Sequence, residues 1–180
     1  MKFLPTPISD VFIVEPRIFE DDRGFFFESY HEQQFNDYIK NPVRFVQDNH
    51  SRSGRDVLRG LHYQIQQPQG KLVRAIVGAV LDVAVDLRKQ SPSFGQWVSC
   101  LLSADNKRQL WIPEGFAHGF LVVSDAAEVA YKSTNFYAPQ HERCILWNDP
   151  DLGIDWKSES PILSNKDQTG QLFSAAEVFS

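Results

Sequence analysis

The sequence has few cysteines and no long apolar segment. Only Cys100 and Cys144 occur among its 180 residues, and their spacing fits neither a metal-ligand motif nor a redox motif. Two isolated thiols are more often unreactive core residues than a disulfide, so we expect a reducing compartment. No segment approaches the roughly 18 to 20 apolar residues that span a bilayer, and prolines interrupt the amino-terminal stretch where a signal peptide needs apolar residues. We therefore expect a cytoplasmic protein that is not bound to a membrane.

Excess positive charge is also missing. The chain has 18 Lys and Arg against 23 Asp and Glu, a formal net charge of −5, so it has no overall basic field to hold DNA or RNA. We expect no nucleic-acid partner, and an anionic substrate would need a local cluster of Arg and Lys. Repeats, low-complexity segments and flexible linkers are absent too, and this length predicts one domain over residues 1–180.

Short strand-like runs separated by turn residues fill the middle of the chain. In the run 81–87, apolar residues alternate with Asp82, Ala84 and Asp86, which predicts a strand with two unlike faces. The run 72–77 meets it at Gly78-Ala79, which predicts a tight hairpin. Further strands are predicted over residues 97–102, 109–112, 119–123 and 129–135. Many short strands at this spacing indicate an all-β barrel or sandwich.

Helical signals are few and short. Ser29 followed by Glu32 forms a possible capping box for a helix over 31–40, and Pro42 would end it. On that helix Phe35, Tyr38 and Ile39 would share one face. A second short helix is predicted over 174–178. Neither is long enough to organise a fold, so we expect a β core with a few short peripheral helices.

Unusual polar residues are concentrated in three segments, 47–51, 58–64 and 70–74. In a regular strand over 59–64, Arg59 and His62 would lie on opposite faces, but a kink or bulge at Gly60 would change this. A lone histidine is more often a hydrogen-bonded structural residue than a catalytic one. Arg59 and Lys71 favour a functional interpretation here, because buried cations in a barrel need anionic partners or a ligand.

Residues 113–120 match a turn motif that delivers a histidine, here His118, into the mouth of a cupin barrel. Metal-binding cupins also carry an earlier His-x-His followed by Glu, whereas the segment 62–69 offers His62 and no carboxylate. Two histidines are too few ligands for a well-held transition metal. We therefore expect a barrel without a metal.

A metal-free pocket that contains His, Lys and Tyr is suited to removing a proton beside a carbonyl group. A neutral histidine can act as the base, and a lysine cation can stabilise the enolate oxygen. Inversion of configuration requires a second acid on the opposite face of the substrate. Tyr131, on the predicted strand 129–135, is a candidate for this acid, and a half-buried structural tyrosine is an equal alternative.

Taken in order, these segments closely resemble the dTDP-4-dehydrorhamnose 3,5-epimerase family. The resemblance runs from about residue 13 to residue 173 and is carried by the blocks 16–19, 22–26, 47–51, 58–64, 69–74, 82–88, 113–120, 131–132, 137–139 and 147–150. It implies a cupin (jelly-roll) barrel that works as a homodimer without metal or organic cofactor. The implied reaction is epimerisation of dTDP-4-dehydro-6-deoxy-D-glucose at C3 and C5 to dTDP-4-dehydro-L-rhamnose.

The resemblance also implies residue roles. His62 is the implied base, Tyr131 the acid, Lys71 the group that steadies the enolate oxygen, and Asp167 the partner that orients His62. The implied binding residues are Arg23, Arg59 and Lys166 for the pyrophosphate, Glu28, Gln47, Asn49, His118 and Glu142 for the nucleotide or sugar, and Phe19 with Phe136-Tyr137 for thymine stacking. The amino-terminal region reaches the partner subunit in this family, which implies that Phe19, Arg23 and Glu28 act in trans. The family often has two tyrosines where this chain has Phe136-Tyr137.

Other interpretations remain at this stage. Related deoxysugar enzymes share these residues but invert only C3 or only C5. A metal-dependent cupin would contain stoichiometric Fe, Mn or Zn, and a non-catalytic cupin would bind dTDP without proton exchange. The sequence leaves open the dimer interface, the order of the two epimerisations and the glycan or metabolite that receives the product.

Overall fold

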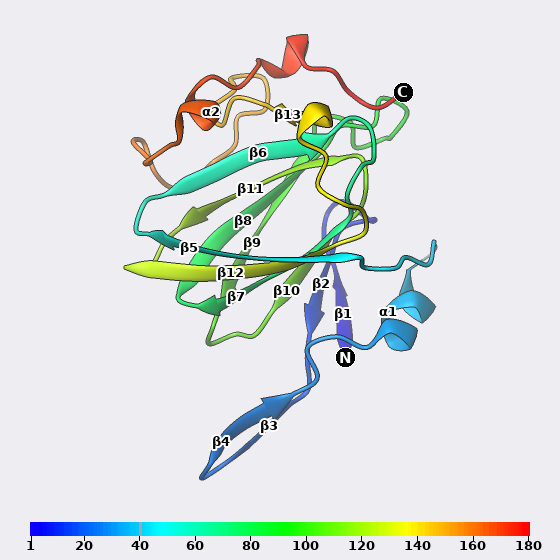
Figure 1. The fold of residues 1–180 in the computed structure, drawn as a ribbon, viewed down its shortest axis with the longest axis vertical. Coiled ribbons are helices and arrows are strands. Elements are labelled where there is room, and N and C mark those ends of the chain that lie inside the picture. The colour runs from blue at the N-terminus through cyan, green and yellow to red at the C-terminus, as the bar shows by residue number, and fades with distance from the viewer. Residues whose placement is uncertain (40) are drawn as a thin grey trace.

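Two antiparallel sheets form the body of the protein, as shown by a computed structural model that describes residues 1–39 and 41–180 (Figure 1). The six-stranded sheet has the order β1 (Lys2–Pro5), β2 (Phe12–Glu15), β10 (Gln109–Ile112), β7 (Lys71–Val77), β12 (Ala126–Ser133) and β5 (Gln47–Gly54). The five-stranded sheet has the order β13 (Glu142–Cys144), β6 (Leu58–Gln64), β11 (Phe116–Val122), β8 (Ala79–Asp86) and β9 (Trp97–Ser103). Successive strands repeatedly change sheet. The predicted all-β jelly roll is confirmed, and its predicted strands are found with ends shifted by a few residues.

The predicted hairpin at Gly78-Ala79 is wrong. β7 pairs with β10 and β12, whereas β8 pairs with β11 and β9, so the two strands lie in different sheets. Gly78 has a φ of +67°, and a Cβ there would meet the carbonyl oxygen of Ala126. The residue therefore makes a sharp corner between the sheets. Local alternation cannot distinguish such a corner from a hairpin, because both are two strands joined by a tight turn.

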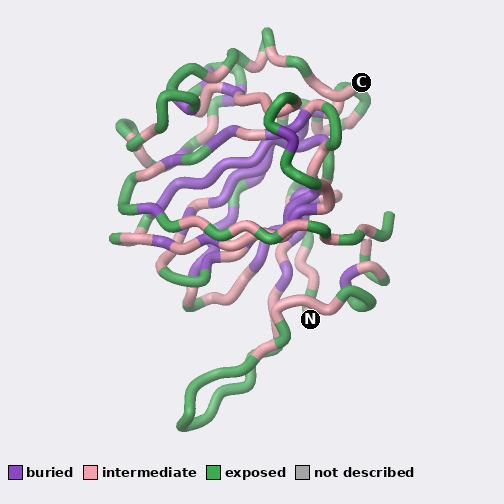
Figure 2. The backbone as a smooth tube through the Cα atoms, viewed as in Figure 1, coloured by how far each residue is buried: buried purple, intermediate pink, exposed green. Residues whose placement is uncertain are grey.

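β8 is buried on both faces, which explains its two alternating sets of side chains. Val80 and Ala84 pack into the barrel interior. The alternate residues Val83 and Val85 pack into a second core, which the carboxy-terminal part of the chain covers. Figure 2 shows the strands of this sheet as the most buried part of the backbone. The predicted alternation is confirmed, and it places fully buried Asp82 on the interior face.

The helices differ from the sequence predictions. α1 spans Glu32–Tyr38, and its N-cap is His31, whose Nδ1 accepts a hydrogen bond from Gln34 N, so the predicted capping box at Ser29 is wrong. The predicted end at Lys40 lies outside the described residues. In place of a helix over 174–178 there is only a 3-10 turn, η2 (Phe173–Ala175), while a short unpredicted helix, α2 (Asn165–Gln168), lies just before it. Within the described ranges, no helix is long and apolar enough to cross a membrane.

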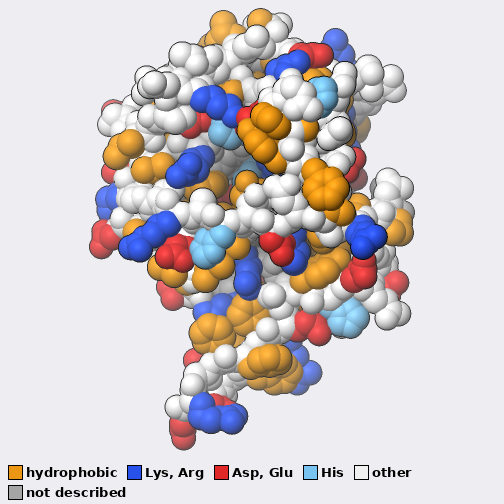
Figure 3. Space-filling view, viewed as in Figure 1, with side chains coloured by type: hydrophobic (Ala, Val, Ile, Leu, Met, Phe, Trp, Pro, Cys, Tyr) orange, Lys and Arg blue, Asp and Glu red, His pale blue; other side chains and the backbone are white. Residues whose placement is uncertain are grey.

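A separate two-stranded hairpin, β3 (Ile18–Asp21) with β4 (Gly24–Phe27), extends away from the two sheets (Figure 1). Its phenylalanines are unusually exposed: Phe19 is 51%, Phe25 57% and Phe26 70% accessible. Hydrophobic side chains are correspondingly visible on its surface in Figure 3. A ribbon of this kind is only marginally stable by itself, so these side chains form a surface suited to contact with another molecule.

Candidate active site

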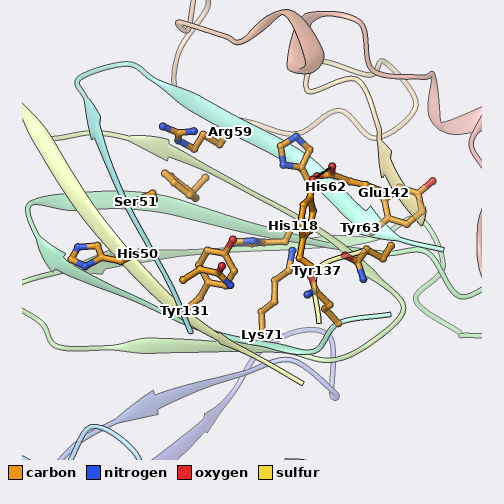
Figure 4. Close-up of a pocket in the computed structure, with 14 residues that line it drawn as sticks. His50, Ser51, Arg59, His62, Tyr63, Lys71, His118, Tyr131, Tyr137 and Glu142 are labelled. Carbon is orange, nitrogen blue, oxygen red and sulfur yellow. Dashed lines mark hydrogen bonds between the residues drawn. The ribbon is translucent and has the colours of Figure 1, made fainter. Parts of the chain in front are cut away.

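A cavity of about 290 Å³ opens between the two sheets (Figure 4). β5, β7 and β12 contribute to it from the six-stranded sheet, and β6, β11 and β13 contribute from the other. Eight of the predicted site residues line it: Asn49, Arg59, His62, Lys71, His118, Tyr131, Tyr137 and Glu142. The structure therefore brings together side chains from six strands that are distant in sequence.

An irregularity at Gly60 decides which side chains of β6 reach the cavity. Arg59 is opposite Phe120 on β11, but His62 is opposite His118, so the pairing shifts by one residue between them. Gly60 has a φ of +130°, and a Cβ at this position would lie only 2.5 Å from the Cα of Gly119. Glycine, which has no Cβ, avoids this clash. As a result Arg59 and His62 both line the cavity, while Leu61 packs into the second core.

His62 is held by a buried carboxylate. Its Nε2 lies 2.6 Å from Oδ1 of Asp167, across 105 residues of sequence, and the same oxygen accepts a bond from Gly60 N. Ser164, the N-cap of α2, donates its hydroxyl to Oδ2 of Asp167 at 2.6 Å. Burial by itself would raise the pKa of Asp167, but the bonds from His62 and Ser164 outweigh it and lower that pKa. The carboxylate stays charged and holds Nε2 of the imidazole in a hydrogen bond. Nδ1 is therefore the ring nitrogen that is left to accept a proton.

Lys71 places a buried ammonium group at the start of β7. Burial lowers the pKa of this lysine to about 8, although Asp82 and Glu142 act to raise it. The side chain is 8% exposed and still lines the cavity. Around neutral pH Lys71 is therefore a desolvated cation, which interacts more strongly with a negative oxygen than an exposed lysine does.

His118 and Asp82 form a buried pair near this cation, and sequence analysis gave Asp82 no role. Nε2 of His118 lies 2.9 Å from Oδ2 of Asp82, and both residues are buried. Burial lowers the pKa of His118 more than Asp82 raises it, so the imidazole is neutral near pH 7. The sequence did carry a signal for Asp82, because it is an acidic residue on the inward face of an otherwise apolar strand. A buried charge requires a partner, so this position indicates a paired carboxylate.

Tyr131 enters the cavity from β12, on the sheet opposite His62. Lys71 Nζ lies 5.9 Å from the centre of its ring. Burial raises the pKa of the Tyr131 phenol, the charge of Glu142 raises it further, and Arg59 lowers it only in part. The phenol therefore keeps its proton at neutral pH and can donate it.

A network of polar contacts forms the rim of the cavity. Glu142 accepts a hydrogen bond from the hydroxyl of Tyr137 at 2.8 Å and pairs with Lys166. Burial by itself would raise the pKa of Glu142, but Lys166 and Tyr137 together lower it. Gln47 accepts a bond from the backbone of Tyr137 and donates to Asn49. Lys166, which the resemblance assigned to pyrophosphate, thus has a carboxylate partner in this structure.

The remaining predicted residues lie elsewhere. Phe19 and Arg23 are on the β3–β4 hairpin, Glu28 follows it, and none of the three lines the cavity of this chain. Pocket residues to which sequence analysis gave no role include His50, Ser51, Tyr63, Gln64, Gln69 and Phe120. Gln64 organises the site, because its amide donates to the carbonyl groups of Gln67 and Phe136 and accepts from the backbone of Ala138. A single polar side chain in a strand gives no signal of such a role.

Potential metal ligands do not form the set expected of a metal-dependent cupin. Among the residues that the structure describes, His62, Cys144 and Asp167 place ligand atoms within 4.8 Å of one another, without His118. Both cysteines are free, as predicted, and burial raises the pKa of the Cys144 thiol to about 12. The fold and this group of side chains define a jelly-roll isomerase of the cupin class, with a histidine–carboxylate pair facing a tyrosine across the cavity.

Comparison with known proteins specifies the family. The family model for dTDP-4-dehydrorhamnose 3,5-epimerase matches residues 5–175. A protein of that name from Pseudomonas aeruginosa is 63% identical over 180 residues, or 99% of each chain, and one from Salmonella typhimurium is 58% identical over 178 residues, or 98% of this chain and 97% of the relative. The chain belongs to the dTDP-4-dehydrorhamnose 3,5-epimerase family and is an epimerase.

A solved structure agrees with this assignment. The crystal structure of dTDP-6-deoxy-D-glucose-3,5-epimerase from Legionella pneumophila, in complex with dTDP-4-keto-L-rhamnose, superposes with a TM-score of 0.95. It is 51% identical in sequence, and the match covers 98% of this chain and 94% of that one. The similarity therefore extends over both sheets and the cavity between them.

Proposed function

We propose that this enzyme converts dTDP-4-dehydro-6-deoxy-D-glucose to dTDP-4-dehydro-L-rhamnose, and that His62, Asp167, Lys71 and Tyr131 carry out both inversions. The observation that carries the proposal is the placement of His62 and Tyr131 on opposite sheets of one cavity. A sugar ring between them has a proton acceptor on one face and a proton donor on the other, which is what inversion of a carbon centre requires.

The ketone at C4 makes the protons on both C3 and C5 acidic, so one base can serve the two centres in turn. His62 accepts the proton at Nδ1, while Asp167, hydrogen-bonded to Nε2 at 2.6 Å, stabilises the imidazolium that forms. The negative charge moves to the ketone oxygen. Lys71 stabilises this charge from a buried position, where electrostatic interactions are strong.

Tyr131 then returns a proton to the carbon from the opposite face. Its raised pKa keeps the phenol protonated before the reaction, and Lys71 at 5.9 Å from its ring offsets the negative charge left after donation. Solvent restores both groups after each inversion, so that the same pair can act at the second carbon. His118, held neutral against Asp82, contacts the sugar from the floor of the cavity.

The nucleotide lies along the polar rim in this proposal. Arg59 donates to Ser53 Oγ and forms no ion pair with a carboxylate among residues 1–39 and 41–180, so its charge is available for the pyrophosphate. Lys166 adds positive charge beside Glu142. Phe136 and Tyr137, both largely exposed, offer aromatic surfaces for thymine, and Gln47, Asn49 and Glu142 provide hydrogen bonds.

The proposed active unit is a homodimer. The exposed Phe19 and the Arg23 guanidinium on the projecting hairpin lie outside the cavity of their own chain, and Glu28 follows them. A hairpin that inserts beside a partner's cavity would bury these phenylalanines and supply stacking and charge to its nucleotide. We further propose that the chain is a single domain with no nucleic-acid or membrane partner and no metal or organic cofactor in the reaction. A cytoplasmic location is also proposed, and the two free thiols support it because the cytoplasm is reducing.

The decisive test is incubation with dTDP-4-dehydro-6-deoxy-D-glucose in D₂O, followed by NMR of the sugar. Deuterium at both C3 and C5 with inversion is the expected result, and inversion at C3 alone would contradict double epimerisation. His62→Ala should abolish exchange at both carbons by removing the base. The matched control His141→Ala, which removes an imidazole outside the cavity, should leave exchange intact.

A further inference from the structure

Cys144 lies beside the His62–Asp167 pair, and the proposed reaction does not use it. On β13 it is directly opposite His62 of β6, so the two side chains are cross-strand neighbours. Its Sγ, an imidazole nitrogen of His62 and a carboxylate oxygen of Asp167 all lie within 4.8 Å of one another. Three different ligand types therefore converge behind the proposed base.

These donors match the preferences of a particular kind of cation. Thiolate, imidazole and carboxylate are the ligands that proteins use for Zn²⁺, with bonds of about 2.0 to 2.3 Å. Ligand atoms of such a tetrahedral ion lie roughly 3.3 to 3.8 Å apart. The three atoms already lie within 4.8 Å of one another, and His62 Nε2 and Asp167 Oδ1, now 2.6 Å apart, would move apart by about 0.7 Å to admit the ion. A thiolate and a carboxylate also neutralise a divalent charge, and the fourth position is left for water.

We propose that a soft divalent cation such as Zn²⁺ binds to His62 Nε2, Cys144 Sγ and Asp167 Oδ1 and thereby inhibits the enzyme. The thiol proton is released to solvent when the sulfur binds the ion. The ion takes the lone pair of Nε2, so the proton of the neutral imidazole must reside on Nδ1. That nitrogen then has no free lone pair, and His62 cannot accept a proton from the substrate.

Metal binding and inhibition depend on different features of the site. Metal binding depends only on the positions of the three ligands, whereas inhibition also rests on the proposed role of His62 as base. Cys144 provides the means to separate them, because it belongs to the ligand set but has no assigned part in catalysis. Cys100 is a control, since it is the second free thiol and lies buried in the barrel core, away from His62 and Asp167.

The test uses the full-length enzyme freed of trace metal by chelation. Cobalt chloride is titrated into wild type, Cys144→Ala and Cys100→Ala, and the near-ultraviolet thiolate-to-cobalt absorption band is recorded. Zinc chloride is titrated in parallel while epimerisation is measured. We expect the band in wild type and Cys100→Ala but not in Cys144→Ala. Zinc should inhibit wild type and Cys100→Ala at near-stoichiometric amounts, and a chelator should restore their activity. Inhibition of Cys144→Ala should need at least about 10-fold more zinc, because loss of a ligand weakens binding at least as much as loss of an outer partner does.

Two results would overturn the inference. Absence of a thiolate band in wild type, or equal zinc sensitivity of wild type and Cys144→Ala, would remove the metal site while leaving the proposed epimerisation untouched. A Cys144-dependent band without loss of turnover would instead overturn the inhibition and, with it, the role of His62 as base.

Discussion

Arg59 and His62 both point into the cavity from β6, although residues three positions apart in a regular strand point to opposite faces. The shift in pairing at Gly60 makes this possible, because one extra residue of β6 is accommodated between the Arg59 and His62 positions opposite β11. A guanidinium for an anionic substrate and the proposed base thus share one cavity. The same bulge aims the backbone N–H of Gly60 at Asp167, which ties the strand to the carboxylate that holds His62.

Gly60→Ala should strongly destabilise the protein. The new Cβ would lie 2.5 Å from the Cα of Gly119 and 2.8 Å from the carbonyl oxygen of His118, at a φ of +130°. We expect the free energy of unfolding to fall by about 2 to 4 kcal/mol, measured by urea denaturation. Gly54→Ala is the control, because nothing lies within 4 Å of a Cβ there. Comparable losses in both variants would contradict the steric account.

Asp167→Asn should impair turnover far more than nucleotide binding. An amide cannot stabilise the imidazolium of His62 as a carboxylate does, so we expect kcat to fall by about 10²-fold to 10⁴-fold. Affinity for dTDP, measured by calorimetry, should change little. The exposed Asp155→Asn is the control and should retain wild-type kcat. A large loss of dTDP affinity in Asp167→Asn would indicate a binding role instead.

Asp167 also predicts a pH dependence of stability. Its pKa is lowered in the folded state, so the unfolded chain binds more protons as the pH falls. The stability that Asp167 contributes is present above its unfolded value of 3.8 and is lost as pH falls through the lower folded pKa. Chemical denaturation at pH 7 and pH 3 should show a smaller acid-induced loss in Asp167→Asn than in wild type. Parallel losses in the two proteins would rule this contribution out.

Lys71→Met should stabilise the protein while reducing its activity. The pKa of Lys71 falls from 10.5 unfolded to about 8 folded, which makes burial of the cation cost up to about 3 kcal/mol at pH 7. In wild type this cost disappears as the pH rises from about 8 to 10.5, so that stability increases there. The methionine variant should have a higher free energy of unfolding at pH 7, whereas Lys132→Met, at a surface ion pair, should change it little.

Asp82→Asn should move the alkaline limit of activity to lower pH. The charge of Asp82 raises the pKa of Lys71 against the effect of burial, so its removal lowers that pKa below about 8. Because the neutral amine cannot stabilise an enolate, kcat/KM should decline at lower pH than in wild type. The measurement is a profile of kcat/KM from pH 6 to 9. A uniform loss at every pH would show that Asp82 acts only through the packing of His118.

Tyr131→Phe should separate exchange from inversion. His62 can still remove and return a proton on its own face, so deuterium continues to enter the sugar from D₂O. The opposite-face donor is missing, and epimerised product should form much more slowly than deuterium is incorporated. NMR of the sugar follows both quantities in one sample. Full turnover of the variant would contradict the role of Tyr131 as acid.

Much of the fold was predictable because its signals are local. The alternation in residues 81–87 gave a strand, and the structure shows it with each face in a separate core. The corner at Gly78 was not predictable, since the residues that β7 and β8 pair with lie far away in sequence. The helix over 174–178 failed for a related reason: the segment forms a 3-10 turn and an irregular stretch that pack against the second core, and these tertiary contacts outweigh a weak helical preference.

By itself, the sequence determined the all-β class, the family and the identity of the polar residues, because these depend on residue types and their order along the chain. Only the tertiary structure decided which of those residues meet. It brought Asp167 to His62 across 105 residues, paired Asp82 with His118 near Lys71, and left the hairpin with Phe19 outside its own cavity. The physical reason is that such contacts are set by strand pairing between distant segments and by the bulge at Gly60. Pairing between distant segments leaves no local pattern in the chain, and Gly60 marks a kink or bulge without showing which side chains it brings to one face.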